Sequence, residues 1–445
     1  MKIRCRKLNG MRKFKEKICK SVVLLFLLSG LFLVAGCGHK ASEPVETAGP
    51  APVTLDFYTW KDEESYMKEL ARRYMDSHEG IVVTVHALPT YEYRQSLEIS
   101  LNGSKPIDVY ASSKPSIGAI NQEKGYAFDL TPYLGEGDTD GYGEWFDDLK
   151  QEEKFFMLPY RMSSWVVYYN KKIFDEFNLP YPKEGWTWEE YTETARQLTR
   201  KTADGRQIYG SMSFDLNGTW WRTPARTTGK EDPLDAEGLL QLKRAAEWSY
   251  QMAYEYHAQP KYTDFTSVDS QDYNREFLEG NSGMYFNGEW CLPILNDAVE
   301  EKGSDFEYDV APMPHWAGEE EDSVATAAVV QVAAKSEHPE EAVDFVKFIC
   351  GEEGAAILAE KSLIPAWNSP EIRQIFKNSL IMPEHADYFF SDNKISQILP
   401  DKNYEEALDI VRKYVNQYLL QEISSDQAFL SIEEEFAEKG LKQEK

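Results

Sequence analysis

Residues 53–110 read VTLDFYTWKDEESYMKELARRYMDSHEGIVVTVHALPTYEYRQSLEISLNGSKPIDVY, and the order of apolar runs in this stretch decides the fold. Apolar and polar residues alternate in runs that begin at Val53 and Ile81, and Ile107–Tyr110 is a third short apolar run. Such runs predict strands. The two intervals between them carry apolar side chains at helical spacing. Strand, helix, strand, helix and strand in this order predict an α/β unit with a largely parallel sheet.

The rest of the chain continues this mixture. Thr187 is a favourable N-cap for a helix over residues 188–199, because its hydroxyl accepts a hydrogen bond from an unpaired backbone amide. Residues 323–334 are rich in Ala and Val and predict a buried strand, while residues 339–349 predict a helix that begins with proline. Residues 403–440 are helical in pattern nearly throughout.

The N-terminal residues have the pattern of an export signal. A basic stretch precedes the apolar run Val22–Ala35, and small residues connect this run to Cys37. A charged region, a short apolar region and small residues before a cleavage site describe a signal peptide. The junction also resembles a lipobox, the processing site of bacterial lipoproteins, which implies that Cys37 is lipidated. The alternative is an ordinary signal peptide. We expect a signal peptide over residues 1–36 and a lipid-anchored flexible tether over residues 37–53.

The charge balance excludes one class of partner. The chain has 48 Lys and Arg against 75 Asp and Glu, a formal net charge of −27. Residues 1–36 hold nine of the basic residues and one of the acidic residues, so the remainder carries a formal charge of −35. Such a chain repels the phosphates of nucleic acids, and we therefore expect no nucleic acid partner. The aromatic share of 13% is too high for a disordered chain.

Only two of the five cysteines lie beyond the predicted lipidation site, namely Cys291 and Cys350. Export to an oxidising compartment permits a disulfide between them. The alternative is two buried free thiols, which we favour because nothing else in the sequence marks the two residues as a pair.

The sequence contains none of the common catalytic motifs. We find no Gly-rich phosphate loop, no Cys-x-x-Cys pair and no Gly-x-Ser-x-Gly elbow. The seven histidines form no local pair with the spacing of metal ligands. We therefore predict that the chain is not an enzyme and that it has neither a metal site nor a cofactor.

Tryptophans stand where the periodic patterns break. Trp60 follows the first predicted strand, while Trp290 and Trp367 follow segments typical of loops. Trp220 and Trp221 are adjacent and cannot both face inward from one strand, so we expect at least one to be exposed or to face a ligand. Aromatic faces beside polar side chains suit a sugar, because the C–H face of the sugar lies on the ring while polar groups bind its hydroxyls. Core packing is the alternative for each single tryptophan.

Several segments, taken in their order, resemble the extracellular solute-binding proteins of bacterial ABC importers. The resemblance is to the branch of large lipoproteins that includes sugar and oligosaccharide binders. It runs from about residue 54 to 370, and each segment alone is weakly specific. The segments are Leu55–Trp60, Pro106–Tyr110, Gly125–Leu134, Leu158–Lys171, Gly185–Glu190, Phe277–Trp290, Asp309–Pro314 and His338–Ala342. Two positions depart from the family pattern, because Ile107 is an extra residue and Gly185 replaces a proline.

The resemblance implies an α/β fold of two lobes, the type II form of the periplasmic-binding-protein-like fold. The lobes are joined by a hinge that the chain crosses several times, and they close around a ligand in the cleft between them. The first lobe is expected to span residues 54–160 and 310–345. The second is expected to span residues 161–309 and 346–445.

The resemblance also implies which residues face the cleft. They are Trp60, Glu64, Ser112, Tyr160, Arg161, Trp220, Trp221, Asn287, Glu289, Trp290 and Trp367. Trp60, Trp221 and Trp290 would stack on sugar faces, while Glu64, Arg161, Asn287 and Glu289 would bind hydroxyls. Arg161 is unexpected for a neutral sugar, because a buried guanidinium often meets a carboxylate. That carboxylate belongs either to a uronate or sialylated ligand or to the protein itself, and the many acidic residues favour the protein.

The resemblance thus predicts a monomeric binding protein, held by a lipid anchor at the outer face of the bacterial cell membrane. It would capture a carbohydrate, of which an oligosaccharide is the favoured kind, and deliver it to the membrane subunits of an ABC permease. Two alternatives stay open. One is a binder of a non-sugar solute such as a peptide or polyamine. The other is an exported carbohydrate-active enzyme, which needs two opposed carboxylates that no motif marks.

Overall fold

The computed structural model describes residues 52–203, 205–213, 220–265, 270–319, 325–390 and 403–441. Residues Pro52–Lys445 form a unit of their own, separate from the N-terminal residues. The predicted signal peptide, Cys37 and nearly all of the predicted tether lie outside the described residues. In the described part of the chain, no helix has the length and apolar character needed to cross a membrane.

The strands of the described residues form one sheet in the order β2-β1-β3-β9-β4-β7-β6-β5, and β8 pairs with β4 outside this order. The strands are β1 (Val53–Trp60), β2 (Ile81–Leu88), β3 (Val109–Ser112), β4 (Leu158–Asn170), β5 (Arg200–Lys201), β6 (Gln207–Ser213), β7 (Ser282–Gly288), β8 (Tyr308–Ala311) and β9 (Ala325–Val332). Parallel pairing joins β1 to β2 and β3, which confirms the α/β unit predicted from residues 53–110. Beyond this unit the sheet is mixed, because β9 and β4 run antiparallel to their neighbours.

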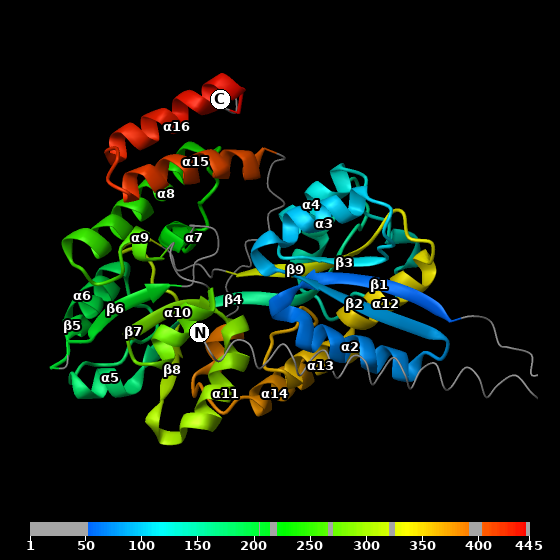
Figure 1. Cartoon of the computed structure of the whole chain (residues 1–445), viewed down its shortest axis with the longest axis horizontal. Helices are drawn as coiled ribbons and strands as arrows, with labels where there is room; N and C mark the ends of the chain where they lie inside the picture. Colours follow the sequence, from blue (N-terminus) through cyan, green and yellow to red (C-terminus); the bar gives the residue numbers. More distant parts are fainter. Residues whose placement is uncertain are drawn as a thin grey trace, which may run out of the picture. The chain divides into compact units, whose positions relative to one another are not determined.

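Strand β4 belongs to two lobes. Its first half, up to Ser164, pairs with β9, and its second half, from Trp165 onward, pairs with β7 and β8. The buried apolar side chains follow this division. One core gathers around β1, β3 and the first half of β4, and two further cores lie around β6, β7 and the second half of β4. Figure 1 shows β4 and β9 connecting the two groups of strands.

Helices cover both faces of the sheet in each lobe. In the first lobe, α3 (Tyr93–Asn102) and α4 (Pro115–Glu123) lie on one face, and α2 (Glu64–Ser77), α12 (Pro339–Cys350) and α13 (Glu352–Glu360) lie on the other (Figure 1). The remaining α-helices are α5 (Lys171–Glu176), α6 (Trp188–Leu198), α7 (Thr223–Arg226), α8 (Ala236–Tyr250), α9 (Tyr262–Phe265), α10 (Ser270–Leu278), α11 (Leu292–Lys302), α14 (Pro370–Ser379), α15 (Tyr404–Leu419) and α16 (Ser425–Lys439).

The first core continues past the predicted lobe boundary at residues 345 and 346. This boundary falls inside α12, whose buried side chains from Ala342 to Cys350 all lie in the first core. A helix is one rigid unit that buries a single apolar stripe, so it packs as a whole. Helix α13 contributes to two cores. Leu358 lies in the core of the first lobe, and the next residue, Ala359, lies in a core of the second lobe.

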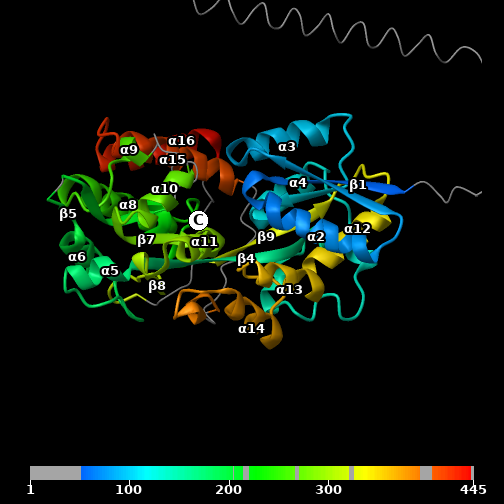
Figure 2. The ribbon, with the colours of Figure 1, turned by 60° about the horizontal axis from the view of Figure 1, so that its bottom comes forward.

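The C-terminal helices pack on the second lobe. Helices α15 and α16 form an antiparallel pair against α8, as Figure 2 shows. Lys243 of α8 pairs with Asp426, and Ser425 donates a hydrogen bond to Glu247 at 2.6 Å. The predicted N-cap is confirmed as well, since the Thr187 hydroxyl accepts a hydrogen bond from the backbone amide of Glu190 at 3.1 Å.

Candidate functional site

The two lobes meet at a buried group of charged side chains. Arg161 lies in the first half of β4 and is 6% exposed. Its Nε donates to Oε1 of Glu63 at 2.9 Å, and its Nη1 donates to Oε1 of Glu289 at 2.9 Å. Glu63 follows β1 in the first lobe, and Glu289 follows β7 in the second. One guanidinium therefore holds a carboxylate from each lobe.

The remaining polar atoms of this group are also paired. Nη1 of Arg161 donates to Ser163 at 3.0 Å, and Oε2 of Glu289 accepts the backbone amide of Ser164 at 3.0 Å. Oε2 of Glu63 accepts the Tyr160 hydroxyl at 2.6 Å. The pairing of Arg161 within the protein, which we favoured, is thereby confirmed. Its guanidinium is committed to protein carboxylates and not to a ligand.

Two carboxylates share the single positive charge of Arg161, and Glu289 is the one whose pKa is raised. Burial raises the pKa of Glu289 from 4.5 to about 7, because the loss of hydration outweighs the attraction of Arg161. Glu289 is fully buried, so its ionised form depends on Arg161 and on hydrogen bonds from the backbone amides of Ser164 and of Glu289 itself. The lobe junction therefore contains a carboxyl group that titrates near neutral pH.

A pair of tryptophans borders the charged group on the side of the second lobe. Trp290 directly follows Glu289, and its ring packs edge to face against Trp165 with the ring centroids 5.4 Å apart. Both rings are half-buried. The Trp290 ring also lies on Gly288, where an added Cβ would come within 1.9 Å of the ring, so only glycine fits there. Trp165 was not predicted, although it is the first residue of β4 beyond its pairing with β9.

The other predicted tryptophans are more buried or lie elsewhere. Trp60 is 8% exposed and packs edge to face on Tyr93 in the first core. Trp220 and Trp221 are 2% and 0% exposed, so neither is exposed, and a role of one of them toward a ligand stays a prediction. They lie on a short 3-10 helix, Trp220–Arg222, and not on a strand, so the alternation rule does not apply. Trp367 is half-buried and packs on Tyr142.

Of the predicted polar residues, some lie at the lobe junction, and others lie at the surface or are buried elsewhere. Glu64 lies at the surface of α2, where it pairs with Lys61 and Lys68, and the neighbouring Glu63 occupies the buried position. Ser112 is buried beside Gln331, and Asn287 is buried with its Nδ2 donating to the Tyr285 hydroxyl at 2.8 Å. Of the predicted residues, the structure gathers Tyr160, Arg161, Glu289 and Trp290 at the lobe junction.

One group of side chains has the spacing of metal ligands. Ligand atoms of Asp309, Glu384 and His385 lie within 4.8 Å of one another. However, Asp309 is buried and its oxygens are occupied, because they accept the Val310 amide at 2.9 Å and the His385 amide at 3.1 Å and pair with Nδ1 of His385 at 2.7 Å. These contacts suffice to explain the group as a structural His–Asp pair, and we assign no metal to it.

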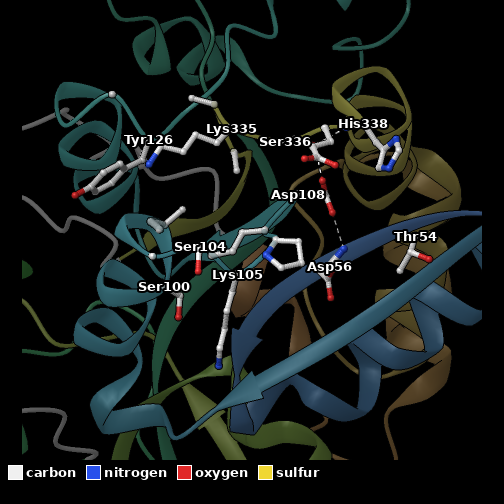
Figure 3. Close-up of a pocket in the computed structure, with 18 residues that line it drawn as sticks. Thr54, Asp56, Ser100, Ser104, Lys105, Asp108, Tyr126, Lys335, Ser336 and His338 are labelled. Carbon is white, nitrogen blue, oxygen red and sulfur yellow. Dashed lines mark hydrogen bonds between the residues drawn. The ribbon is translucent and has the colours of Figure 1, made fainter.

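A cavity of about 560 Å³ lies at the opposite end of the first lobe. Figure 3 shows Asp108 at its centre, where the carboxylate accepts the Asp56 amide at 2.8 Å and the Ser336 hydroxyl at 2.5 Å. Its lining residues Thr54 and Asp108 stand at the beginnings of β1 and β3. Ligands of open α/β sheets bind at the carboxyl ends of the strands, which is where Glu63 lies. The cavity is thus separate from the lobe junction.

Comparisons with known proteins agree with this architecture. A family model described as bacterial extracellular solute-binding protein matches residues 59–356. The multiple sugar-binding protein of Streptococcus mutans is 22% identical over 345 residues, which cover 71% of this chain and 75% of that protein. A solved sugar transporter from Rhizobium etli, in an open conformation, is 24% identical with a TM-score of 0.69, over 86% of this chain and 98% of that one. An ABC substrate-binding protein from Listeria monocytogenes, in complex with cycloalternan, is 19% identical with a TM-score of 0.73, over 88% and 100%. The two structures confirm the predicted two-lobed fold.

Proposed function

Because the chain belongs to the bacterial extracellular solute-binding proteins, we propose that it captures a carbohydrate between its two lobes and delivers it to the permease of an ABC importer. Membership in this family makes it an exported binding protein. The finer parts of the proposal are the chemical class of the solute, the place of binding, the permease and the lipid anchor. Each of these has its own support.

The observation that carries the proposal is the half-buried pair Trp165 and Trp290 at the lobe junction. Large aromatic side chains are usually buried, and a stacked sugar would cover the face that remains exposed. The charged group beside the pair links the two lobes, so a solute on these rings lies where closure of the lobes encloses it. The names of the relatives support the same class, since one is a sugar-binding protein and another binds cycloalternan.

The state of the carboxylates supports binding over hydrolysis. A glycosidase needs a proton donor and a second carboxylate that both face the scissile bond. At the lobe junction, the carboxylates of Glu63 and Glu289 both bind Arg161 and have little exposure. We therefore propose a binding protein that releases its solute unchanged.

The sequence supports a lipid anchor at Cys37, and we propose that it holds the monomeric protein at the outer face of the bacterial cell membrane. Two or more acyl chains give stable anchoring. The acidic body would then stand away from anionic headgroups, within reach of a permease in the same membrane.

A thermal-shift screen tests the proposed function. The panel contains neutral oligosaccharides, acidic oligosaccharides, peptides and polyamines, and mass spectrometry of the recovered ligand detects cleavage. A ligand at about a hundred times its Kd adds roughly 2.7 kcal/mol to stability, which raises the Tm measurably. We expect a shift with one family of oligosaccharides, recovered intact. A shift with peptides or polyamines alone would refute the carbohydrate, and recovery of cleaved sugar would indicate an enzyme.

A further inference from the structure

A second group of charged side chains links the two lobes, and in the described residues it has more cations than carboxylates. Lys114 stands just before α4 of the first lobe, and its Nζ lies 2.5 Å from Oε1 of Glu405 in α15. Ser116 donates to the same oxygen at 3.2 Å. The first turn of α15, which packs on the second lobe, therefore reaches the first lobe directly.

Two arginines of the second lobe share one glutamate in this group. Nη2 of Arg222 lies 2.7 Å from Oε2 of Glu231 and also donates to the Tyr404 hydroxyl at 3.3 Å. Arg226 approaches the other oxygen of Glu231 only to 3.5 Å. This approach is made by the Nε of Arg226, which is buried and makes a long ion pair with Glu231 in place of a full hydrogen bond. Lys114, Arg222 and Arg226 thus face two carboxylates, and the unmatched charge lies on Arg226.

The pKa of Arg226 reflects this excess of positive charge. Burial lowers its pKa and the neighbouring Arg222 lowers it further, while Glu231 opposes both. The Arg226 side chain is 21% exposed, so its guanidinium is only partly hydrated, and an anion that reaches it would gain charge-assisted hydrogen bonds. A spare positive charge is also contrary to the composition, because the chain beyond residue 36 carries a formal charge of −35.

Arg226 lies beside the aromatic pair of the proposed binding site. Its guanidinium carbon is 5.5 Å from the centroid of the Trp165 ring, and Trp165 packs on Trp290. Arg161, in contrast, is saturated by Glu63 and Glu289. Of these two arginines, only Arg226 has a donor left for a ligand, and it lies on the side of the junction where the half-buried rings are.

We propose that the solute is a sugar with an anionic group, a carboxylate or a sulfate, and that Arg226 binds this group while the sugar ring lies on the tryptophan pair. The inference rests on the proposed function and narrows it. A planar guanidinium binds such oxygens through two parallel charge-assisted hydrogen bonds. The anionic group would then pair donors at the partly exposed end of the Arg226 side chain.

The test measures binding by titration calorimetry on the full chain, in a polyoxyethylene detergent that has no sugar headgroup. The acidic probes are trigalacturonate for the carboxylate and a chondroitin sulfate tetrasaccharide for the sulfate. The neutral probes are the methyl ester of trigalacturonate, maltotriose and xylotriose. We expect one acidic probe to bind at least tenfold more tightly than every neutral probe, and its affinity to fall as salt is added.

Variants then connect the affinity to Arg226. Arg226→Gln should weaken binding of the acidic probe at least tenfold, and Arg226→Lys, which keeps the charge without the fork, should have an intermediate effect. Arg196→Gln is the matched control, because Arg196 is an exposed arginine that also lies over an aromatic ring, that of Tyr256. Circular dichroism and the Tm show whether each variant is folded, and Arg226→Lys carries the test if Arg226→Gln is unfolded.

Each other outcome overturns the inference. Equal affinity of wild type and the Arg226 variants for the acidic probe would show that Arg226 does not bind it. Binding of neutral probes alone would refute the anionic group and leave the proposed carbohydrate function standing. Binding of no sugar, together with a thermal shift by a peptide or polyamine, would overturn both. Failure of both acidic probes to bind also counts against the inference.

Discussion

Glu289 of the second lobe lies 2.9 Å from Arg161, and both side chains are buried where the two lobes meet. Because Glu63 of the first lobe binds the same guanidinium, the pair is one half of a bridge between the lobes. The bridge contains two acids and one base. Its stability therefore depends on the protonation of Glu289.

The first prediction concerns pH. Burial raises the pKa of Glu289 from 4.5 to about 7, so the folded chain holds this proton more tightly than the unfolded chain. The resulting stabilisation is complete below pH 4.5 and is lost as the pH rises through about 7. Urea denaturation at a series of pH values should show the free energy of unfolding decreasing across this interval. Glu289→Gln should remove that part of the decrease.

Glu300→Gln is the control for this prediction, because Glu300 is exposed on α11 of the same lobe. It should keep the pH dependence of the wild type. An unchanged dependence in Glu289→Gln would mean that Glu289 does not take up a proton in this interval.

Removal of the shared cation should be costly. Arg161→Met leaves Glu63 and Glu289 buried without a counter-charge, which typically costs about 3–5 kcal/mol of folding free energy. Denaturant titration measures the loss. The triple variant with Glu63→Gln and Glu289→Gln added to Arg161→Met should recover part of the lost folding free energy, because no buried carboxylate is then left without a counter-charge. A loss below about 1 kcal/mol in the single variant would show that water already solvates the group.

The sequence predicts those parts of the molecule that local rules determine. Strand and helix periodicity locates the elements from β1 to β3, and the N-cap at Thr187 marks the beginning of α6, because both depend on neighbours in the chain. The adjacent tryptophans Trp220 and Trp221 show the limit of such a rule. Alternation assumes a strand, and the chain forms a 3-10 turn there.

Positions within the site are harder to predict than elements. The family resemblance implies Glu64 as a cleft residue, whereas the structure buries Glu63, the last residue of the 3-10 turn before α2. Lys114 and Glu405 are 291 residues apart, and no periodicity relates two such positions. The excess of positive charge around Arg226 involves Lys114, the segment from Arg222 to Glu231, and Glu405, which come together only in the folded chain. The excess of acids made pairing of Arg161 predictable and left its partners open.

The two cysteines should be unreactive in the folded protein. Cys291 and Cys350 are free thiols in the cores of different lobes, and burial raises the pKa of both. Because the thiolate is the reactive form, iodoacetamide at mildly alkaline pH should modify neither residue until denaturant is added. Peptide mass spectrometry identifies the modified positions. A peptide pair linked through Cys291 and Cys350 under non-reducing conditions would contradict this prediction.

The lipid anchor is tested by a single substitution. Cys37→Ser should move the chain from the membrane pellet to the soluble fraction and abolish labelling by radioactive palmitate, because the thiol that carries the lipid is gone. Cys19→Ser, in the predicted signal peptide, is the control and should behave as the wild type. Continued membrane association and labelling of Cys37→Ser would refute the lipobox.

The last prediction concerns the half-buried Trp290, whose ring packs on Trp165 and Gly288. Trp290→Ala should weaken binding of the sugar identified by the screen at least tenfold, about 1.4 kcal/mol, because the stacking face is lost. Tyr256→Ala is the matched control, since Tyr256 is an exposed aromatic of the same lobe that stands against Arg196. Titration calorimetry gives the affinities, and the Tm shows whether both variants are folded. An unchanged affinity in folded Trp290→Ala would move the sugar away from the tryptophan pair, and equal losses in both variants would indicate a general effect of truncating aromatic side chains.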